Sequence, residues 1–295
     1  MALIAGTHYE GDIIRPPNEA DSLLLQAAVG CSHNKCTFCG AYKDKRFRIK
    51  DEAVVFADIA HAAERFTEVR RVFLTDGDAL IIPMARLTRL LEEIRARMPW
   101  VRRVGVYGNA KSILLKSPEE LAELRRLGLG IVHLGLESGD PEVLREVRKG
   151  VSPERAIEAG RRVIDAGIKL SVTVLLGLAG RERSLRHARA TGEALTRMDP
   201  NFVGALTYMP LPNTGLGQRV LAGEFQVLDP GELLLELREM LDATTMTRGQ
   251  FLSNHASNYL PLRVRLPRGK EEAIKTIDRA LAGMIRLRPE EIRRL

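Results

Sequence analysis

Three cysteines stand within nine residues of this 295-residue chain, and their spacing is the feature that points most directly to chemistry. Cys31, Cys36 and Cys39 follow one another as C-x4-C-x2-C and are all the cysteines that the chain has. A loop this short can turn three sulfurs towards one point, and Gly30 and Gly40 flank it where the backbone must bend freely. Three clustered thiolates without a fourth cysteine predict a metal site with one open coordination position.

Three kinds of site are compatible with this loop. A zinc ion could take the three sulfurs with His33 as fourth ligand, although His33 lies too close between the cysteines to reach a fourth corner easily. A plant-type [2Fe–2S] ferredoxin shares the same run but needs a distant fourth cysteine, which this chain lacks. A cubane held by three cysteines leaves one iron ready to bind a small molecule. The pattern favours the cubane, with zinc as the alternative.

Strand and helix patterns alternate through the residues that must position this loop. Apolar runs predict strands over 22–30, 72–78, 101–110, 131–138, 169–180 and 201–211. Helical spacing of apolar residues predicts helices over 51–69, 84–98, 117–128, 141–149, 153–167 and 183–198. Six such units predict a parallel sheet covered by helices. We therefore expect the α/β class, as a partial TIM-like (β/α)6 barrel with a helical C-terminal extension; an open doubly wound sheet is the alternative.

The same patterns divide the chain into three parts. Residues 1–21 are an irregular N-terminal lead-in, and residues 22–218 are the core barrel. Residues 219–295 form the C-terminal helical extension, in which helices over 231–246 and 270–285 are joined through a polar loop at 252–262.

Small and polar residues follow each predicted strand. Ligands of parallel α/β folds bind beyond the C-terminal ends of the strands. Behind the cysteines come Asp76-Gly77-Asp78, Gly108-Asn109, Glu137-Ser138-Gly139-Asp140, Gly177-Leu178-Ala179-Gly180 and Met209-Pro210. We expect these residues to gather on one rim. The simpler interpretations are turn formation around Gly77, and N-capping by Asp140 ahead of Pro141, which we favour for Asp140.

Composition and charge narrow the function classes. The chain is 45% apolar and 28% charged, as expected of a globular protein, and has no apolar run long enough for a membrane span. No signal peptide is recognisable, and an odd number of cysteines in one loop argues against a secreted disulfide scaffold. We predict a cytoplasmic location.

The net charge of +7 is concentrated near the C-terminus. Residues 263–295 hold ten Lys and Arg against five Asp and Glu, which leaves 10 − 5 = +5. Such a tail could bind RNA or another polyanion. A solvated amphipathic helix with interleaved charges explains it equally simply, and we favour that interpretation.

Beyond the cysteines, the sequence over about residues 22–215 resembles the radical S-adenosylmethionine (radical SAM) superfamily. The cluster loop of that family follows the first barrel strand, usually as C-x3-C-x2-C with an aromatic residue before the last cysteine. Phe38 takes the aromatic position, whereas the gap between Cys31 and Cys36 is one residue longer. LTDGD at 74–78 stands where the family has a Gly-Gly-Glu-like turn, so Asp76 and Asp78 would accept from the methionyl ammonium.

Two further segments carry the resemblance. GLESGDPEVLREVRKG at 135–150 is similar to the fourth-strand segment of Elongator-type and methylthiotransferase enzymes, and VLLGLAG at 174–180 to the fifth-strand segment that flanks adenine. By this likeness Glu137 and Ser138 would bind the ribose or amino acid end of SAM, and Lys149 its carboxylate. The full set of implied SAM contacts is Phe38, Asp76, Gly77, Asp78, Asn109, Glu137, Ser138, Lys149 and Gly177.

The resemblance implies a [4Fe–4S] cluster and SAM as cofactors, and an electron donor such as flavodoxin or ferredoxin. The reduced cluster would cleave SAM to methionine and a deoxyadenosyl radical, which takes a hydrogen atom from a substrate. Radical formation needs no side chain as acid or base, so no catalytic residue is named. The alternative function is a non-catalytic iron–sulfur or zinc protein, as a redox sensor or nucleic-acid binder.

Substrate contacts are expected at Tyr208 and in the polar loop 252–262, where Asn254, His255 and Asn258 offer hydrogen-bonding groups. The alternative is a turn-rich connector between two helices. Alanine at each of the three loop positions should spare cluster and SAM binding but abolish turnover. A small molecule, a peptide and RNA all stay open as substrates.

Overall fold

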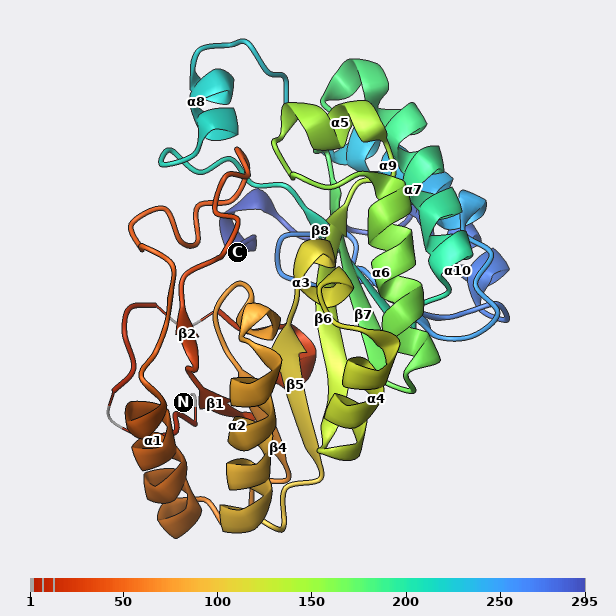
Figure 1. The fold of residues 1–295 in the computed structure, drawn as a ribbon. Coiled ribbons are helices and arrows are strands. Elements are labelled where there is room, and N and C mark those ends of the chain that lie inside the picture. The colour runs from red at the N-terminus through yellow and green to blue at the C-terminus, as the bar shows by residue number, and fades with distance from the viewer. Residues whose placement is uncertain (1–2, 7, 13, 295) are drawn as a thin grey trace. The chain divides into compact units, whose positions relative to one another are not determined.

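The chain folds into two compact units in a computed structural model that describes residues 3–6, 8–12 and 14–294 (Figure 1). The first unit comprises the described residues up to Asn34, together with Ala41–Leu134 and Arg162–Leu170. The second unit comprises Lys35–Gly40, Gly135–Arg161 and the described residues from Ser171 onwards. The cysteine loop therefore contributes residues to both units.

Parallel strands form the sheet of the first unit. Their spatial order is β1 (Leu23–Leu25), β4 (Arg71–Leu74), β5 (Arg103–Tyr107) and β6 (Leu129–Glu137), of which β6 belongs to this unit up to Leu134. The residues of β1 are buried on both faces, as in parallel sheets that helices cover. The connecting helices are α1 (Glu52–Arg65), α2 (Met84–Arg97), α3 (Ala110–Leu114) and α4 (Pro118–Arg126). Helices α1 and α2 lie side by side (Figure 1).

Short elements complete the first unit. They are the 3-10 turns η1 (Pro17–Glu19) and η2 (Ala79–Ile81) and the strands β2 (Ala28–Val29) and β3 (Arg48–Ile49). Strands β2 and β3 pair antiparallel, so the predicted single strand over 22–30 is wrong. It breaks at Gln26, whose side chain bonds to the backbone of Glu10 and to Asp76 rather than continuing a regular strand.

The second unit holds β7 (Lys169–Leu176) from Ser171 onwards, β8 (Phe202–Thr207), β9 (Gln250–Leu252) and β10 (Arg263–Arg265). Strands β7, β8 and β9 are parallel, and β10 runs antiparallel to β9. The remaining elements are α5 (Pro141–Glu146), α6 (Pro153–Asp165), η3 (Arg181–Arg183), α7 (Ser184–Met198), α8 (Gly215–Leu221), α9 (Pro230–Ala243), α10 (Lys270–Leu281) and η4 (Glu290–Ile292). Helix α9 lies between α7 and α10 and contacts both (Figure 1).

The predicted alternation of six parallel strands with helices is confirmed, and its local signals explain why. Ser117 caps α4 in a reciprocal pair with Glu120, and Asp140 caps α5 through its side chain. Two details differ. The strand predicted over 101–110 ends at Tyr107, because Asn109 caps the short helix α3. The C-terminal extension contains β9 and β10 besides its helices.

In the part of the chain that the structure describes, no helix combines the length and the apolar character that crossing a membrane requires.

Candidate functional site

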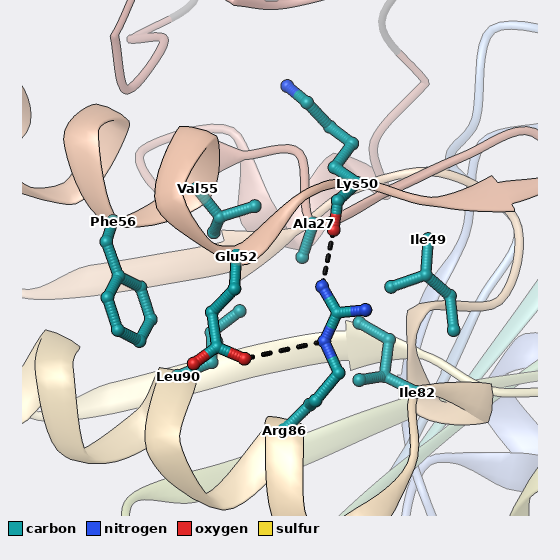
Figure 2. Close-up of a pocket in the computed structure, with 9 residues that line it drawn as sticks. All are labelled: Ala27, Ile49, Lys50, Glu52, Val55, Phe56, Ile82, Arg86 and Leu90. Atoms are coloured by element: carbon teal, nitrogen blue, oxygen red, sulfur yellow. Dashed lines mark hydrogen bonds and ion pairs between the residues drawn. The ribbon is translucent and has the colours of Figure 1, made fainter.

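The base of the cysteine loop is held by hydrogen bonds within the first unit. Strands β2 and β3 close the loop, and the Lys50 N–H after β3 donates to the Ala27 carbonyl at 3.1 Å. Figure 2 shows Arg86 of α2 reaching this base, where its guanidinium donates to the Lys50 carbonyl at 2.5 Å and pairs with Glu52 of α1. The small apolar pocket of Figure 2 is lined by the same base and by α1 and α2. Helices thus fix the point from which the loop departs.

Asp76 follows β4 and has one carboxylate oxygen without a partner. Its Oδ2 accepts from the Gly30 N–H at 2.7 Å and from Gln26 Nε2 at 3.2 Å. Its Oδ1 is buried and has no hydrogen-bond partner among the described residues. Burial raises the pKa of Asp76, against the lowering effect of the Gly30 bond. The nearby Tyr9 hydroxyl donates to Thr75, and burial raises the Tyr9 pKa to about 12. The Tyr9 hydroxyl also lies close enough to Asp76 to lower its pKa, but it donates to Thr75, so among the described residues Asp76 Oδ1 is a buried acceptor still open to a further donor.

Gly77 packs directly on the first cysteine. Its N–H donates to the Gly30 carbonyl at 2.9 Å. A Cβ at Gly77 would lie 2.7 Å from the Cys31 Cβ, 3.2 Å from its Sγ and 2.9 Å from Tyr42 Cε2. Only glycine fits at this close approach of two loops, so the turn after β4 and the position of Cys31 depend on each other.

Both carboxylate oxygens of Asp78 accept hydrogen bonds from the protein. Its carboxylate accepts from the Ser32 hydroxyl, from Ser112 Oγ at 2.5 Å and from Asn109 Nδ2 at 2.7 Å, while the Asn109 N–H donates at 3.1 Å. Asn109 in turn caps α3 by accepting from the Ser112 N–H at 2.9 Å. Burial raises the pKa of Asp78. The structure brings the predicted residues Asp78 and Asn109 together, in a network that holds Ser32 beside Cys31.

The second half of the cysteine loop belongs to the second unit. The Thr37 N–H donates to the Val147 carbonyl at the end of α5 (2.9 Å), and the Leu216 N–H of α8 donates to the Thr37 carbonyl (2.8 Å). Phe38 packs against a buried apolar cluster that includes Val147, Tyr208 and Leu216. Phe38, the predicted aromatic residue of the motif, is therefore partly buried against apolar side chains of this unit.

The cysteines themselves are all partly exposed. Cys31 lies in the first unit, whereas Cys36 and Cys39 lie in the second. Within residues 3–6, 8–12 and 14–294, no group of three or more His, Cys, Asp or Glu side chains has the arrangement of a single-ion site. Coordination of one cluster by the three cysteines stays a prediction.

Glu137 and Lys149 form a shielded ion pair in the second unit. Glu137 ends β6 with φ of +66°, an uncommon conformation for a residue with a side chain, and Lys149 Nζ lies 2.8 Å from its Oε1. A Cβ at Gly135 would lie 2.2 Å from that oxygen and 2.9 Å from the Lys149 nitrogen. The two predicted SAM contacts are thus brought together, and Gly135 leaves the space for them.

Ser138 is buried and bonded inside the protein. Its Oγ lies 2.7 Å from His187 Nδ1 and accepts from the Asp140 N–H at 2.9 Å. His187 Nε2 lies 3.1 Å from the Leu175 carbonyl, and burial lowers the His187 pKa to about 4. The imidazole is therefore neutral. Its Nε2–H donates a hydrogen bond to the Leu175 carbonyl, and its Nδ1 accepts a hydrogen bond from the Ser138 hydroxyl. The Ser138 hydroxyl therefore has two partners inside the protein, and its contact with SAM stays a prediction.

Gly177 is held by a residue that the sequence reasoning missed. Gly177 has φ of +80°, and its N–H donates to Glu236 Oε1 at 2.6 Å. Glu236 is fully buried in α9, and burial raises its pKa to about 7. The available signal was one acidic residue among Leu233, Leu237 and Met240 on the apolar face of the predicted helix.

The raised Glu236 pKa gives a testable dependence of stability on pH. The folded chain binds a proton at this site below about 7, whereas the ordinary value is 4.5, so the folded state holds more protons between these values. Its contribution to stability is present below pH 4.5 and is lost as the pH rises through 7. Between pH 5 and 8, thermal unfolding of Glu236→Gln should therefore change less than that of the wild type, with Glu239→Gln as control. Equal pH profiles would contradict this assignment. His187 faces Glu236 at 3.6 Å but titrates at lower pH.

The polar loop joins β9 to β10 and is tied to the end of β8. The Thr207 N–H donates to Ser257 Oγ at 3.0 Å, and Thr207 Oγ1 donates to Asn258 Oδ1 at 2.8 Å. Asn258 Nδ2 donates to the carbonyls of Ala205 and Ser253, both at 2.8 Å. Asn258 is therefore a buried anchor of the loop, and substrate contact by this residue stays a prediction.

His255 and Asn254 are the more exposed predicted residues of this loop. Both are partly exposed. His255 Nδ1 lies 2.9 Å from Ser257 Oγ, and burial lowers the His255 pKa. These two side chains stay the substrate candidates of the loop.

Two arginines of the basic C-terminal segment donate hydrogen bonds to backbone carbonyls of the polar loop 252–262. Arg288 Nη1 donates to the carbonyls of His255 and Asn258, both at 2.8 Å. Arg293 Nε donates to the Ser257 carbonyl at 2.7 Å, and its guanidinium lies 4.0 Å from the centre of the Tyr259 ring. Part of the positive charge near the C-terminus thus has a structural use.

Tyr208 follows β8 and buries its hydroxyl. The ring packs edge-on against Phe225 in the cluster that also holds Phe38. Its hydroxyl oxygen is buried without a hydrogen-bond partner among the described residues. Burial raises the Tyr208 pKa to about 12, so the phenol is neutral. Thr214 lies close enough to this hydroxyl to lower its pKa, against the effect of burial, and substrate contact by Tyr208 stays a prediction.

Substitutions in the loop should separate anchoring from substrate contact. Asn258→Ala leaves two carbonyls and the Thr207 hydroxyl without their buried partner, so we expect a loss of about 3 kcal/mol of unfolding free energy. Asn254→Ala should change stability by less than about 0.5 kcal/mol, because that side chain is partly exposed. Urea unfolding monitored by circular dichroism measures both. Equal stabilities would contradict the anchoring role.

Comparison with known proteins assigns a family. The model of the radical SAM superfamily matches residues 25–187, more than half of the chain. A search of curated proteins finds no match. Among solved structures, the radical SAM methyltransferase TsrM from Kitasatospora setae, with cobalamin and a [4Fe-4S] cluster bound, is 22% identical with a TM-score of 0.55, over 68% of this chain and 39% of that one.

Two more solved structures are similar. Methylornithine synthase (PylB) is 19% identical with a TM-score of 0.53, over 76% of this chain and 63% of that one. Coproporphyrinogen III oxidase (HemN) from Escherichia coli is 17% identical with a TM-score of 0.57, over 75% of this chain and 51% of that one. This chain spans less than two thirds of each of the three.

These likenesses confirm the predicted fold class, the partial TIM-like α/β architecture. They do not select the Elongator or methylthiotransferase branch, which stays a prediction. With the match to residues 25–187, the chain belongs to the radical SAM superfamily.

Proposed function

We propose that this chain is a radical SAM enzyme. It holds a [4Fe–4S] cluster through Cys31, Cys36 and Cys39 and binds SAM at the remaining iron. Support comes from the family match over residues 25–187, which includes all three cysteines and the turns after β4, β6 and β7. When bound and reduced, such a cluster would supply the electron for splitting SAM into methionine and a deoxyadenosyl radical, and that radical would take a hydrogen atom from the substrate.

The observation that carries the proposal is the unpartnered oxygen of Asp76. A buried carboxylate oxygen without a donor is costly, so its site is complete only when a ligand supplies one. The methionyl ammonium of SAM is such a donor, and the bond would be charge-assisted. Gly77 separates this carboxylate from Asp78 and packs on Cys31 within the same unit. An ammonium acceptor beside a cluster cysteine is what SAM bound at a cluster iron requires.

Under this proposal the other predicted residues either position the turn after β4 or contact SAM. Asp78 and Asn109 position the turn, because they are bonded to each other and to Ser32. Lys149 and Glu137 provide a cation and an anion for the carboxylate and hydroxyl groups of SAM, and their mutual ion pair orients both. Phe38 and Gly177 provide an aromatic surface and a turn for the remainder of the cofactor.

The chain's own residues bind, orient and shield. The donor of the electron would be a flavodoxin or ferredoxin, in a reducing compartment such as the cytoplasm. The substrate side would be formed by Tyr208, Asn254 and His255, beyond the end of β8. The likeness of residues 135–150 to Elongator-type enzymes includes RNA among the substrates to test, beside small molecules and peptides.

Anaerobic reconstitution with iron and sulfide, followed by dithionite and SAM, tests the proposal. We expect a cubane spectrum, with methionine and 5′-deoxyadenosine in equal amounts by chromatography. An intact cubane that yields neither product would favour the non-catalytic iron–sulfur alternative. Stoichiometric zinc with no iron uptake would favour the zinc alternative.

A further inference from the structure

A carboxylate that the proposed chemistry does not use lies in the middle of α9. Glu236 is fully buried, and its neighbours on the same helix face are Leu233, Leu237 and Met240. Burying an ionisable group among apolar side chains costs several kcal/mol unless hydrogen bonds compensate. The position of this residue therefore needs an explanation beyond packing of the helix.

The partners of Glu236 come from the segment that follows β7. Its Oε1 accepts from the Gly177 N–H at 2.6 Å, and its Oε2 accepts from the Ser184 hydroxyl. Gly177 is the first residue after β7, and Ser184 is the first residue of α7. One carboxylate thus holds both ends of the turn between β7 and α7, including the left-handed residue Gly177.

The same group connects to the turn after β6. His187 Nε2 lies 3.6 Å from Glu236 Oε1 and 3.1 Å from the Leu175 carbonyl. His187 Nδ1 lies 2.7 Å from Ser138 Oγ, which also accepts from the Asp140 N–H. A buried chain of polar contacts therefore links the ends of two neighbouring βα units, all within the second unit. Both ends carry residues that the proposed function assigns to SAM.

We infer that Glu236 is a positioning residue for the SAM site, which fixes the turn Gly177–Gly180 in its binding conformation from the buried side. This inference rests on the proposed function. Glutamine at this position keeps one oxygen for the Gly177 N–H, and the Ser184 hydroxyl can rotate to accept from the new amide. Leucine has a similar volume but removes both acceptors, which leaves the Gly177 N–H without a buried partner.

Two measurements on Glu236→Leu test the inference. Arg181 and Arg183 follow the turn directly, so trypsin reports on its opening. We expect cleavage there to be about tenfold faster than in the wild type, as for loss of one buried hydrogen bond. In the reconstituted enzyme, KM for SAM should rise about tenfold while kcat at saturating SAM and iron content stay unchanged. Glu236→Gln should remain near the wild type in both measurements.

The control is Glu239→Leu, one turn further along α9, where the carboxylate pairs with Arg189 at the surface. It should leave both measurements unchanged. Wild-type protection and wild-type KM in Glu236→Leu would overturn the inference. If that variant fails to fold, Ser184→Ala removes a single donor, and unchanged cleavage at Arg181 and Arg183 would overturn it equally. If the wild type does not cleave SAM, the proposed function is contradicted. The trypsin result would still decide whether Glu236 holds the turn Gly177–Gly180.

Discussion

Replacing Gly77 with alanine is expected to remove most of the iron–sulfur cluster from the reconstituted protein. The added methyl group would lie 2.7 Å from the Cys31 Cβ and 2.9 Å from the Tyr42 ring, distances at which atoms must move. The backbone on both sides is fixed by the Gly77 N–H bond to Gly30 and by the paired strands at the loop base. Cys31 is therefore the group that gives way, and overpacking of this kind also costs about 1–3 kcal/mol of stability.

Iron and sulfide per chain after anaerobic reconstitution measure this effect. The matched control is Gly231→Ala in the first turn of α9, where the nearest atom to the new Cβ is Asp229 Oδ1 at 3.4 Å. This control should load iron as the wild type does. A Gly77→Ala protein that loads a full cluster and cleaves SAM at the wild-type rate would show that the turn and Cys31 move independently.

The parts of the fold that sequence predicted well are those whose signals are local. The β7 strand, the α7 helix and the cap at Asp140 each depend on residues within one element or its next neighbour. The spatial order of the strands could be predicted as well, because βα units that follow one another in sequence usually place their strands side by side. Local patterns were therefore enough for the class of fold and the order of its strands, whereas the predicted C-terminal ends of β5, β7 and β8 were three to four residues too late.

Details that depend on partners distant in sequence could not be predicted in this way. Gln26 breaks a strand because it meets Glu10 and Asp76, the latter 50 residues away. Glu236 reaches Gly177 across 59 residues. A buried acidic residue in an apolar helix face signals that some partner exists, but its identity comes only from the packing of α9 on α7.

Asp76 and Asp78 show the same limit within the candidate site. Both flank Gly77, both are buried, and as sequence they were equally good acceptors for an ammonium. In the structure Asp78 Oδ2 accepts from the side chains of Ser32, Asn109 and Ser112 and its Oδ1 from the Asn109 N–H. Asp76 Oδ1, in contrast, has no hydrogen-bond partner among the described residues. Under the proposed function the two residues therefore have different roles, Asp78 in positioning the turn and Asp76 in binding SAM.

Asp76→Asn should weaken SAM binding strongly while the protein still folds. Asparagine tolerates the φ of +67° at this position. With its oxygen at the Oδ2 site it keeps the bonds from Gly30 and Gln26, and this orientation puts an NH2 group where Oδ1 was. A donor then faces the ammonium of SAM in place of an acceptor. Loss of one charge-assisted bond, with that repulsion added, predicts about a 100-fold rise in Kd.

Equilibrium dialysis of SAM against the reconstituted, oxygen-free protein measures this change, with iron content as the check on the cluster. Asp21→Asn, which removes an exposed carboxylate paired with Arg71, is the charge-matched control and should bind SAM as the wild type does. Asp78→Asn should behave differently from Asp76→Asn. With its oxygen at the Oδ2 site it keeps the three side-chain donors, but its NH2 group then faces the Asn109 N–H, which loses its buried acceptor. The main effects of Asp78→Asn should be lower thermal stability and lower cluster loading. If Asp76→Asn bound SAM normally, the unpartnered oxygen would have another ligand, because a buried carboxylate oxygen is rarely left without a donor.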